Sequence, residues 1–186
     1  MANHENHLRL HIKNMIGRLS ENTIATLFES MGLHPSIISG GEVEILEEIP
    51  DNKLKALRNL LRKAEFDILY DKSRILAEKV LHVIVDMIHY SRELPTIKYS
   101  EYISKKLCIN YTFLSKCFSR NMGTTIEQFI IIQKLERVKK LLKNPEITLT
   151  EIAWSLHYSS TAHLSAQFKR VTGITTSDFR KSTAKH

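Results

Sequence analysis

A repeat in the second half of the chain constrains its fold more than any other feature. Leu114, Ser115, Phe118, Arg120, Gly123 and Phe129 return fifty residues later as Leu164, Ser165, Phe168, Arg170, Gly173 and Phe179. Upstream the offset is forty-nine, because Ile103, Leu107 and Ile109 match Ile152, Leu156 and Tyr158, so the second copy has one extra residue in its turn. Chance rarely repeats so many spacings. The repeat therefore predicts two copies of one structural unit.

Each copy has the layout of a helix-turn-helix unit. A short helix with Ile and Leu four residues apart is followed by a break of three or four residues and a second short helix. Asn110 and Ser159 stand where the second helices would begin, and both residue types cap helices. Two apolar pairs, each spaced by four residues, share one face of these helices and should anchor them: Leu114 with Phe118, and Leu164 with Phe168.

The opposite face of each second helix carries side chains that suit DNA. Small hydroxyl residues let a helix enter the major groove, which is about 12 Å wide, where Gln, Lys and Arg can hydrogen-bond base edges or phosphates. A solvated surface is the alternative, and Phe113 could either touch a thymine methyl or pack against the first helix. We predict DNA contacts from Thr112, Phe113, Lys116, Ser119 and Arg120 in the first copy, and from Ser160, Thr161, His163, Gln167, Lys169 and Arg170 in the second.

Residues 125–143 are expected to form one helix between the two units. Its 19 residues would span about 28 Å at 1.5 Å per residue. Successive major-groove faces lie roughly 34 Å apart. A stiff connector of this length would hold two recognition helices at adjacent turns of DNA.

Charge is distributed unevenly along the chain. Residues 96–186 carry 15 Lys and Arg against 6 Asp and Glu, whereas residues 1–95 carry 12 against 14. The whole positive excess therefore lies in the half that contains the repeat. Such asymmetry favours a polyanionic partner, because neutralised phosphates release their counterions.

The first seventy residues predict a mixed α/β fold. Strands are expected at residues 7–12, 35–39, 42–47 and 66–70, and helices at 20–32, with Ser20 as a cap, and from Pro50 and Asp51 onward. This β-α-β-β-α-β order is that of a ferredoxin-like sandwich. After Asp71 the pattern is helical, and Pro95 should break the first helix. We therefore expect an α+β sandwich domain over residues 1–70 and an all-α double helix-turn-helix domain over residues 73–186.

The helical half resembles the DNA-binding domain of the AraC/XylS family of bacterial transcription regulators. The second copy matches the family pattern at Ile152, Ala153, Tyr158, Ser159, Phe168, Lys169, Arg170, Gly173, Thr175, Phe179 and Arg180. His157 replaces the glycine of the turn, which raises the question whether this residue has positive φ. Leu164 and Thr176 replace an aromatic residue and a proline. The resemblance implies seven helices, two helix-turn-helix units, promoter binding with activation, and contact with RNA polymerase.

The first seventy residues do not resemble the sugar-binding cupin of the best-known members. They are faintly similar to heavy-metal-associated domains, but the chain has no cysteine before Cys108 and so lacks the Cys-x-x-Cys of that family. His4, His7 and His11 are the only hint of a metal site, and we expect none. We predict no cofactor.

Other functional classes receive little support from the sequence. No nucleophile–base pair, phosphate loop or paired carboxylates are recognisable, so we expect no enzyme. No apolar run spans a bilayer and no secretory signal is present, so we expect a cytoplasmic protein without a membrane partner. The alternative function is a metal-handling protein whose helices dock a partner.

A small-molecule effector and a homodimer are left open by the sequence. Trp154 is expected in the core.

Overall fold

The structure is a computed structural model that describes residues 8–38, 41–91 and 93–183. His4 and His7, two of the three histidines weighed as a hint of a metal site, lie outside these residues. The chain divides into two compact units, one of residues 1–83 with 103–124 and one of residues 84–102 with 125–186. The domain boundaries expected from the sequence stay a prediction, and the two units are described separately.

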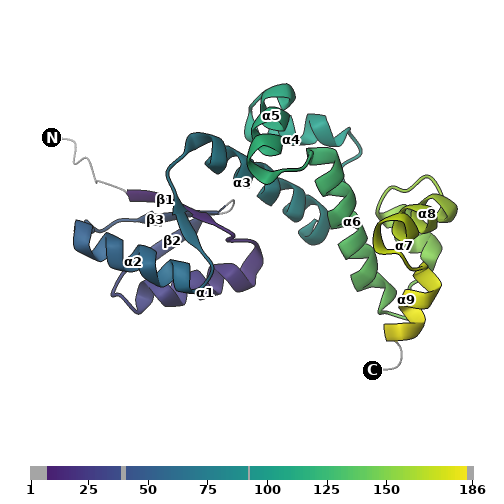
Figure 1. The fold of residues 1–186 in the computed structure, drawn as a ribbon, viewed down its shortest axis with the longest axis horizontal. Coiled ribbons are helices and arrows are strands. Elements are labelled where there is room, and N and C mark those ends of the chain that lie inside the picture. The colour runs from purple at the N-terminus through teal and green to yellow at the C-terminus, as the bar shows by residue number, and fades with distance from the viewer. Residues whose placement is uncertain (1–7, 39–40, 92, 184–186) are drawn as a thin grey trace. The chain divides into compact units, whose positions relative to one another are not determined.

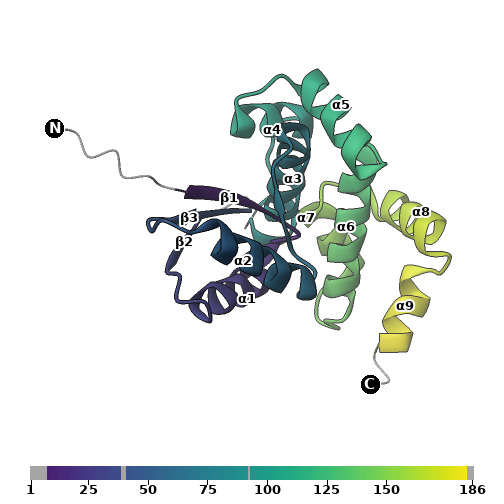
Figure 2. The same ribbon diagram turned by 60° about the vertical axis from the view of Figure 1, so that its left-hand side comes forward.

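The first unit contains the predicted ferredoxin-like sandwich. Its elements follow in the order β1 (Leu8–Lys13), α1 (Gly17–Glu29), β2 (Pro35–Ile38), β3 (Glu42–Ile45), α2 (Asp51–Lys63) and β4 (Asp67–Leu69). The strands form one antiparallel sheet in the order β2-β3-β1-β4. Helices α1 and α2 lie on the same face of this sheet (Figures 1 and 2). The predicted α+β fold class is therefore confirmed.

The core of the sandwich forms between the sheet and these two helices. Alternation along β1 turns Leu10 and Ile12 inward, where both are buried. Ile24 and Phe28, four residues apart on α1, and Leu57 and Leu61 on α2 meet them. Further core positions are Val43, Ile45 and Ile68.

The first helix begins earlier than its predicted cap. Helix α1 starts at Gly17 after Ile16, and no side chain caps it. The Ser20 hydroxyl instead donates to the Ile16 carbonyl oxygen at 2.7 Å, inside the first turn. Ser20 is therefore not the cap, because the chain is already helical when it reaches this residue.

The other face of the sheet is charged and meets the next helix, α3 (Lys72–Val85). The Lys79 ammonium lies 2.6 Å from a carboxylate oxygen of Glu42 on β3, and Arg9 and His11 of β1 flank the same carboxylate. Burial raises the pKa of Glu42, but the hydrogen bond and charge of Lys79, together with the charges of His11 and Arg9, outweigh burial and hold this pKa below its usual range. The Lys79–Glu42 ion pair therefore fastens α3 to the sheet.

From residue 72 onward the described chain is helical, as predicted. Helix α3 continues into a short π-helix, η1 (Asp86–Tyr90), which ends before Pro95. The remaining helices are α4 (Tyr99–Leu107), α5 (Tyr111–Met122), α6 (Ile126–Leu142), α7 (Leu149–Ser155), α8 (Thr161–Thr172) and α9 (Thr176–Thr183). Helices α3 to α9 are the seven α-helices that the resemblance implies for this half of the described chain.

Candidate nucleic-acid interface

The predicted turns both contain a residue in the left-handed region. Cys108, between α4 and α5, has φ +55°, and His157, between α7 and α8, has φ +52°. They are forty-nine residues apart and so occupy equivalent positions of the repeat. The turn therefore requires positive φ, which costs a residue with a Cβ atom about 1–2 kcal/mol relative to right-handed backbone. This answers the question raised by the missing glycine.

The recognition helices α5 and α8 start with matching caps. The Asn110 side chain accepts a 2.9 Å hydrogen bond from the backbone N–H of Thr112. At the second helix, the Ser160 hydroxyl accepts from the backbone N–H of His163 at 3.0 Å. The cap is therefore Ser160 rather than the predicted Ser159. The extra residue of the second copy lies before the helix and shifts its start by one position.

The ends of the two helices correspond equally well. Gly123 (φ +69°) and Gly173 (φ +79°) terminate α5 and α8 in left-handed conformation. Thr125 then caps α6, and the Thr175 hydroxyl accepts from the backbone N–H of Asp178 at the start of α9. The sequence repeat thus corresponds to a structural repeat that includes starts, stops and caps.

The predicted anchors bury one face of each recognition helix. Leu114, Phe118, Leu164 and Phe168 are fully buried. The Phe168 ring packs edge-on against Phe179 of α9, with ring centroids 5.7 Å apart. Each recognition helix is therefore fixed through its apolar side, which leaves the opposite side free.

None of the residues predicted to contact DNA belongs to the buried face. Phe113 has 56% of its surface exposed, which favours its groove-facing alternative over packing against the first helix. Three of the predicted residues are partly buried: Ser119, Thr161 and Gln167. The others besides Phe113 are exposed: Thr112, Lys116, Arg120, Ser160, His163, Lys169 and Arg170. Their contact with DNA stays a prediction.

The sequence gives no sign of the contacts that Tyr158 makes with Gln167 and His163. The buried Tyr158 donates a 2.8 Å hydrogen bond from its hydroxyl to Gln167 Oε1. The His163 ring stands edge-on to the Tyr158 ring at 5.4 Å, and its Nδ1 lies 3.0 Å from the Ser159 hydroxyl. Tyr158 thereby holds Gln167, and Tyr158 and Ser159 both contact the His163 ring. No periodicity in the sequence indicates such a contact.

A buried lysine, Lys134, contacts the ring of Tyr158. Lys134 of α6 is only 8% exposed, and its ammonium lies 4.1 Å from the centre of the Tyr158 ring. Burial lowers the pKa of Lys134 to about 8. Burial also raises the pKa of Tyr158 to about 12, so its hydroxyl stays a hydrogen-bond donor at neutral pH. The cation over the ring compensates part of the cost of burying the lysine.

The prediction that Trp154 lies in the core is wrong. Trp154 is 74% exposed. On α7 the buried residues are Ile152 and Ala153, followed by Leu156 after the helix. A position two residues after Ile152 points to the opposite side of a helix, so Trp154 faces solvent.

Two histidines of the first helix after the sandwich and its π-helical end, His82 and His89, make hydrogen-bonding contacts inside the fold. His82 is buried, and its two ring nitrogens face the carbonyl oxygens of Glu78 and Met15. His89 is half-buried, and its Nε2 lies 2.9 Å from Gln133 Oε1.

Among the residues that the structure describes, no three His, Cys, Asp or Glu side chains form a group that could hold a metal ion. No helix within these residues combines the length and apolar character needed to cross a membrane.

Comparison with known proteins agrees with this geometry. A helix-turn-helix domain family matches residues 103–182. The Msm operon regulatory protein of Streptococcus mutans serotype c is 33% identical over 79 residues, which cover 42% of this chain and 28% of that protein. YtdP of Bacillus subtilis, an uncharacterized HTH-type transcriptional regulator, is 24% identical over 127 residues, which cover 66% of this chain and 16% of that protein. The chain thus spans less than a third of either relative.

A solved structure shares the fold of the helical half. It is a transcriptional regulator with an AraC-type DNA-binding domain from Chromobacterium violaceum, with a TM-score of 0.51 and 20% identity. The similarity covers 58% of this chain and 95% of that chain. Residues 103–182 of this chain therefore match a helix-turn-helix domain family, and the helical half shares the fold of an AraC-type DNA-binding domain.

Proposed function

We propose that this protein is a sequence-specific DNA-binding transcription regulator that places α5 and α8 in adjacent major grooves. The observation that carries the proposal is the pair of repeated helices, each capped by a side chain at its start and a left-handed glycine at its end, anchored by buried apolar residues and exposing polar and cationic side chains. Helix α6 lies between the two helix-turn-helix copies in the chain and has 17 residues, about 25 Å at 1.5 Å per residue. The matched helix-turn-helix family supports the same function.

The exposed residues divide into base readers and phosphate contacts. Gln167 and Arg170 carry the donors that read base edges in the major groove. Lys169, exposed on α8, and Lys116, exposed on α5, suit phosphates, which carry no sequence information. Truncation of Gln167 should therefore weaken specific binding, by about 1–3 kcal/mol, whereas truncation of Lys169 should weaken binding to every sequence.

Three further parts of the proposal concern partners. Contact with RNA polymerase rests on the family resemblance. The sandwich could dimerise the protein or bind an effector, and its position before the DNA-binding domain in the chain supports a regulatory role. A regulator of this kind would work in the cytoplasm of a bacterial cell.

Titration against DNA tests the function directly. The full chain is titrated against a duplex enriched from a random pool and against a shuffled duplex of the same composition, at fixed salt. The proposal expects at least a thousandfold preference for the enriched duplex. Equal affinity for both duplexes would overturn sequence-specific regulation and leave only nonspecific polyanion binding. The same titration with Gln167→Ala and Lys169→Ala separates base reading from phosphate binding.

A further inference from the structure

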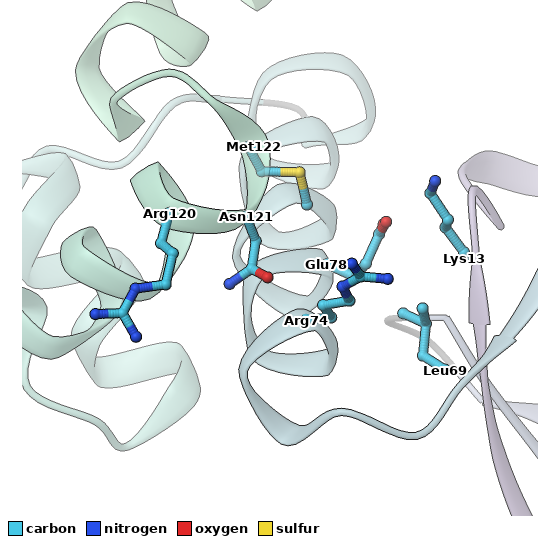
Figure 3. Close-up of a pocket in the computed structure, with 7 residues that line it drawn as sticks. All are labelled: Lys13, Leu69, Arg74, Glu78, Arg120, Asn121 and Met122. Carbon is cyan, nitrogen blue, oxygen red and sulfur yellow. The ribbon is translucent and has the colours of Figure 1, made fainter.

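A small pocket in the first unit joins the sandwich to the end of the first recognition helix. It measures about 240 Å³, below the range of roughly 300–1,000 Å³ that holds drug-sized ligands. Residues of β1, β4, α3 and α5 line it (Figure 3): Lys13, Leu69, Arg74, Glu78, Asn121 and Met122. The pocket therefore suits a molecule of a few heavy atoms that touches α5 and the sandwich together.

The carboxyl group of Glu78 is the unusual feature of this pocket. Glu78 is only 7% exposed, and its Oε2 is buried without a hydrogen-bond partner. A buried polar group that lacks its partner destabilises the fold. Burial also raises the pKa of Glu78, against the opposing charges of His82 and Lys13 and a hydrogen bond from the Asn14 backbone. A ligand that donates a hydrogen bond to Oε2 would remove this cost.

The same pocket presents positive charge. Lys13 and Arg74 are both exposed at its edge, and Figure 3 shows them gathered with Glu78 on one side of the pocket. An arginine fork binds a carboxylate through two parallel hydrogen bonds. Arg120 also lines the pocket, but its side chain extends away from Glu78 and Arg74 in Figure 3 and so stays available to DNA.

We propose that this pocket binds a small carboxylic acid that carries an N–H or O–H donor next to its carboxylate, and that the bound acid regulates α5. An α-amino acid and an α-hydroxy acid share this chemistry. The carboxylate would contact Arg74 and Lys13, and the donor would reach Glu78 Oε2. The regulatory part rests on the proposed DNA-binding function.

The connection to α5 is direct. Asn121, next to the last residue of α5, donates from Nδ2 to the Ser73 hydroxyl of α3 at 2.8 Å. Asn121 and Met122 also line the pocket beside Arg74. A ligand held by Arg74 and Glu78 of α3 therefore fixes the end of α5 against α3 and changes how freely the first recognition helix adjusts to DNA.

Calorimetric titration of the full chain without DNA tests the site. The probes are the twenty amino acids and the hydroxy acids lactate, glycerate and malate, with acetate and inorganic phosphate as anions that lack the adjacent donor. We expect at least one amino or hydroxy acid to bind, and Arg74→Met and Glu78→Met each to weaken it at least tenfold. Arg18→Met, which removes an exposed arginine of α1, is the matched control and should leave the affinity unchanged.

Three results would overturn the site: no probe binds at millimolar concentration, acetate or phosphate binds as tightly as the best acid, or Arg18→Met weakens binding as much as Arg74→Met. Thermal unfolding of each variant verifies that it is folded, and the exposed Arg74 provides a readout if Glu78→Met does not fold.

Regulation is measured separately, with the bound acid added to the DNA titration. At least a threefold change in the dissociation constant for the enriched duplex, absent in Arg74→Met, is expected. An unchanged dissociation constant would overturn the regulatory part alone. A protein that binds the acid but no specific DNA would instead contradict the proposed function and leave the ligand site intact.

Discussion

The hydroxyl of Tyr158 donates a hydrogen bond of 2.8 Å to Oε1 of Gln167. Tyr158 is buried just before α8, and Gln167 lies on the face of α8 that is predicted to read DNA. The bond engages the acceptor oxygen of the glutamine amide and leaves its NH₂ group as the donor toward base edges. A core residue thereby determines which hydrogen bonds the recognition helix can offer.

Removal of this hydroxyl should reduce specificity. A net hydrogen bond contributes about 1 kcal/mol, so we expect Tyr158→Phe to weaken binding to the enriched duplex about fivefold and to leave binding to the shuffled duplex unchanged. Phenylalanine keeps the ring that Lys134 contacts, so the fold is retained. Fluorescence anisotropy with both duplexes measures the effect, and an equal loss on both would show that Tyr158 does not orient Gln167.

The buried Lys134 should make stability depend on pH. Its folded pKa of about 8 lies below the unfolded value near 10.4. Between these values the unfolded chain binds more protons, so the stability of the wild type rises with pH there, and the full cost of burying the charge is present below pH 8. Lys134→Met removes this cost and should be the more stable protein at pH 7.

The sign of this effect is tested by urea unfolding at pH 7, 8, 9 and 10. The difference in unfolding free energy between Lys134→Met and the wild type should narrow by roughly 2 kcal/mol between pH 8 and pH 10. Lys140→Met, an exposed change on the same helix, should show a constant difference. A constant difference for Lys134→Met as well would mean that the buried lysine keeps its ordinary titration.

The two serines before α8 should differ in their contribution to stability. Ser160 caps the helix through the His163 backbone, whereas Ser159 contacts only the exposed His163 ring. Loss of an N-cap costs about 1 kcal/mol, so Ser160→Ala should lower the unfolding free energy by about that amount and Ser159→Ala by less than half of it. Chemical denaturation compares the two variants, and the reverse order would restore Ser159 as the cap.

Glycine at the two turn positions should stabilise the fold. The left-handed backbone of Cys108 and His157 costs about 1–2 kcal/mol, which glycine would remove. Glycine also has more conformational freedom in the unfolded chain, and this lowers the net gain in stability. We therefore expect about 0.5–1 kcal/mol of added stability from His157→Gly and from Cys108→Gly. His157→Ala is the control, because alanine keeps the strained Cβ atom. Equal stability of His157→Gly and His157→Ala would contradict a strained turn.

Local patterns in the sequence predict much of this structure. The spacing of Leu164 and Phe168 identifies the buried face of α8, and Gly173 marks its end, because both features depend on residues within one or two turns. The strands of the sandwich follow from alternation and from the turn near Gly41. These elements are determined by neighbours in the chain, so a single sequence is enough to place them.

The residues that the sequence misplaces depend on longer-range contacts or on a shift of one position. Trp154 is apolar and lies among buried neighbours in sequence, yet it faces solvent because it is two residues from Ile152. Ser159 and Ser160 are both good caps, and only the actual start of α8 separates them. The contacts of Lys134 with Tyr158 and of Tyr158 with Gln167 join α6 to α8, and no periodicity reveals which lysine is buried.

The most direct test of the account is the pattern of bases in DNA selected by the full chain from a random pool. Two recognition helices in adjacent major grooves predict two conserved blocks whose centres lie about 10 base pairs apart. Gln167→Ala should relax one block, and Lys116→Ala should not change the preference in either. A single conserved block, or two blocks at variable spacing, would contradict the placement of α5 and α8 in adjacent grooves.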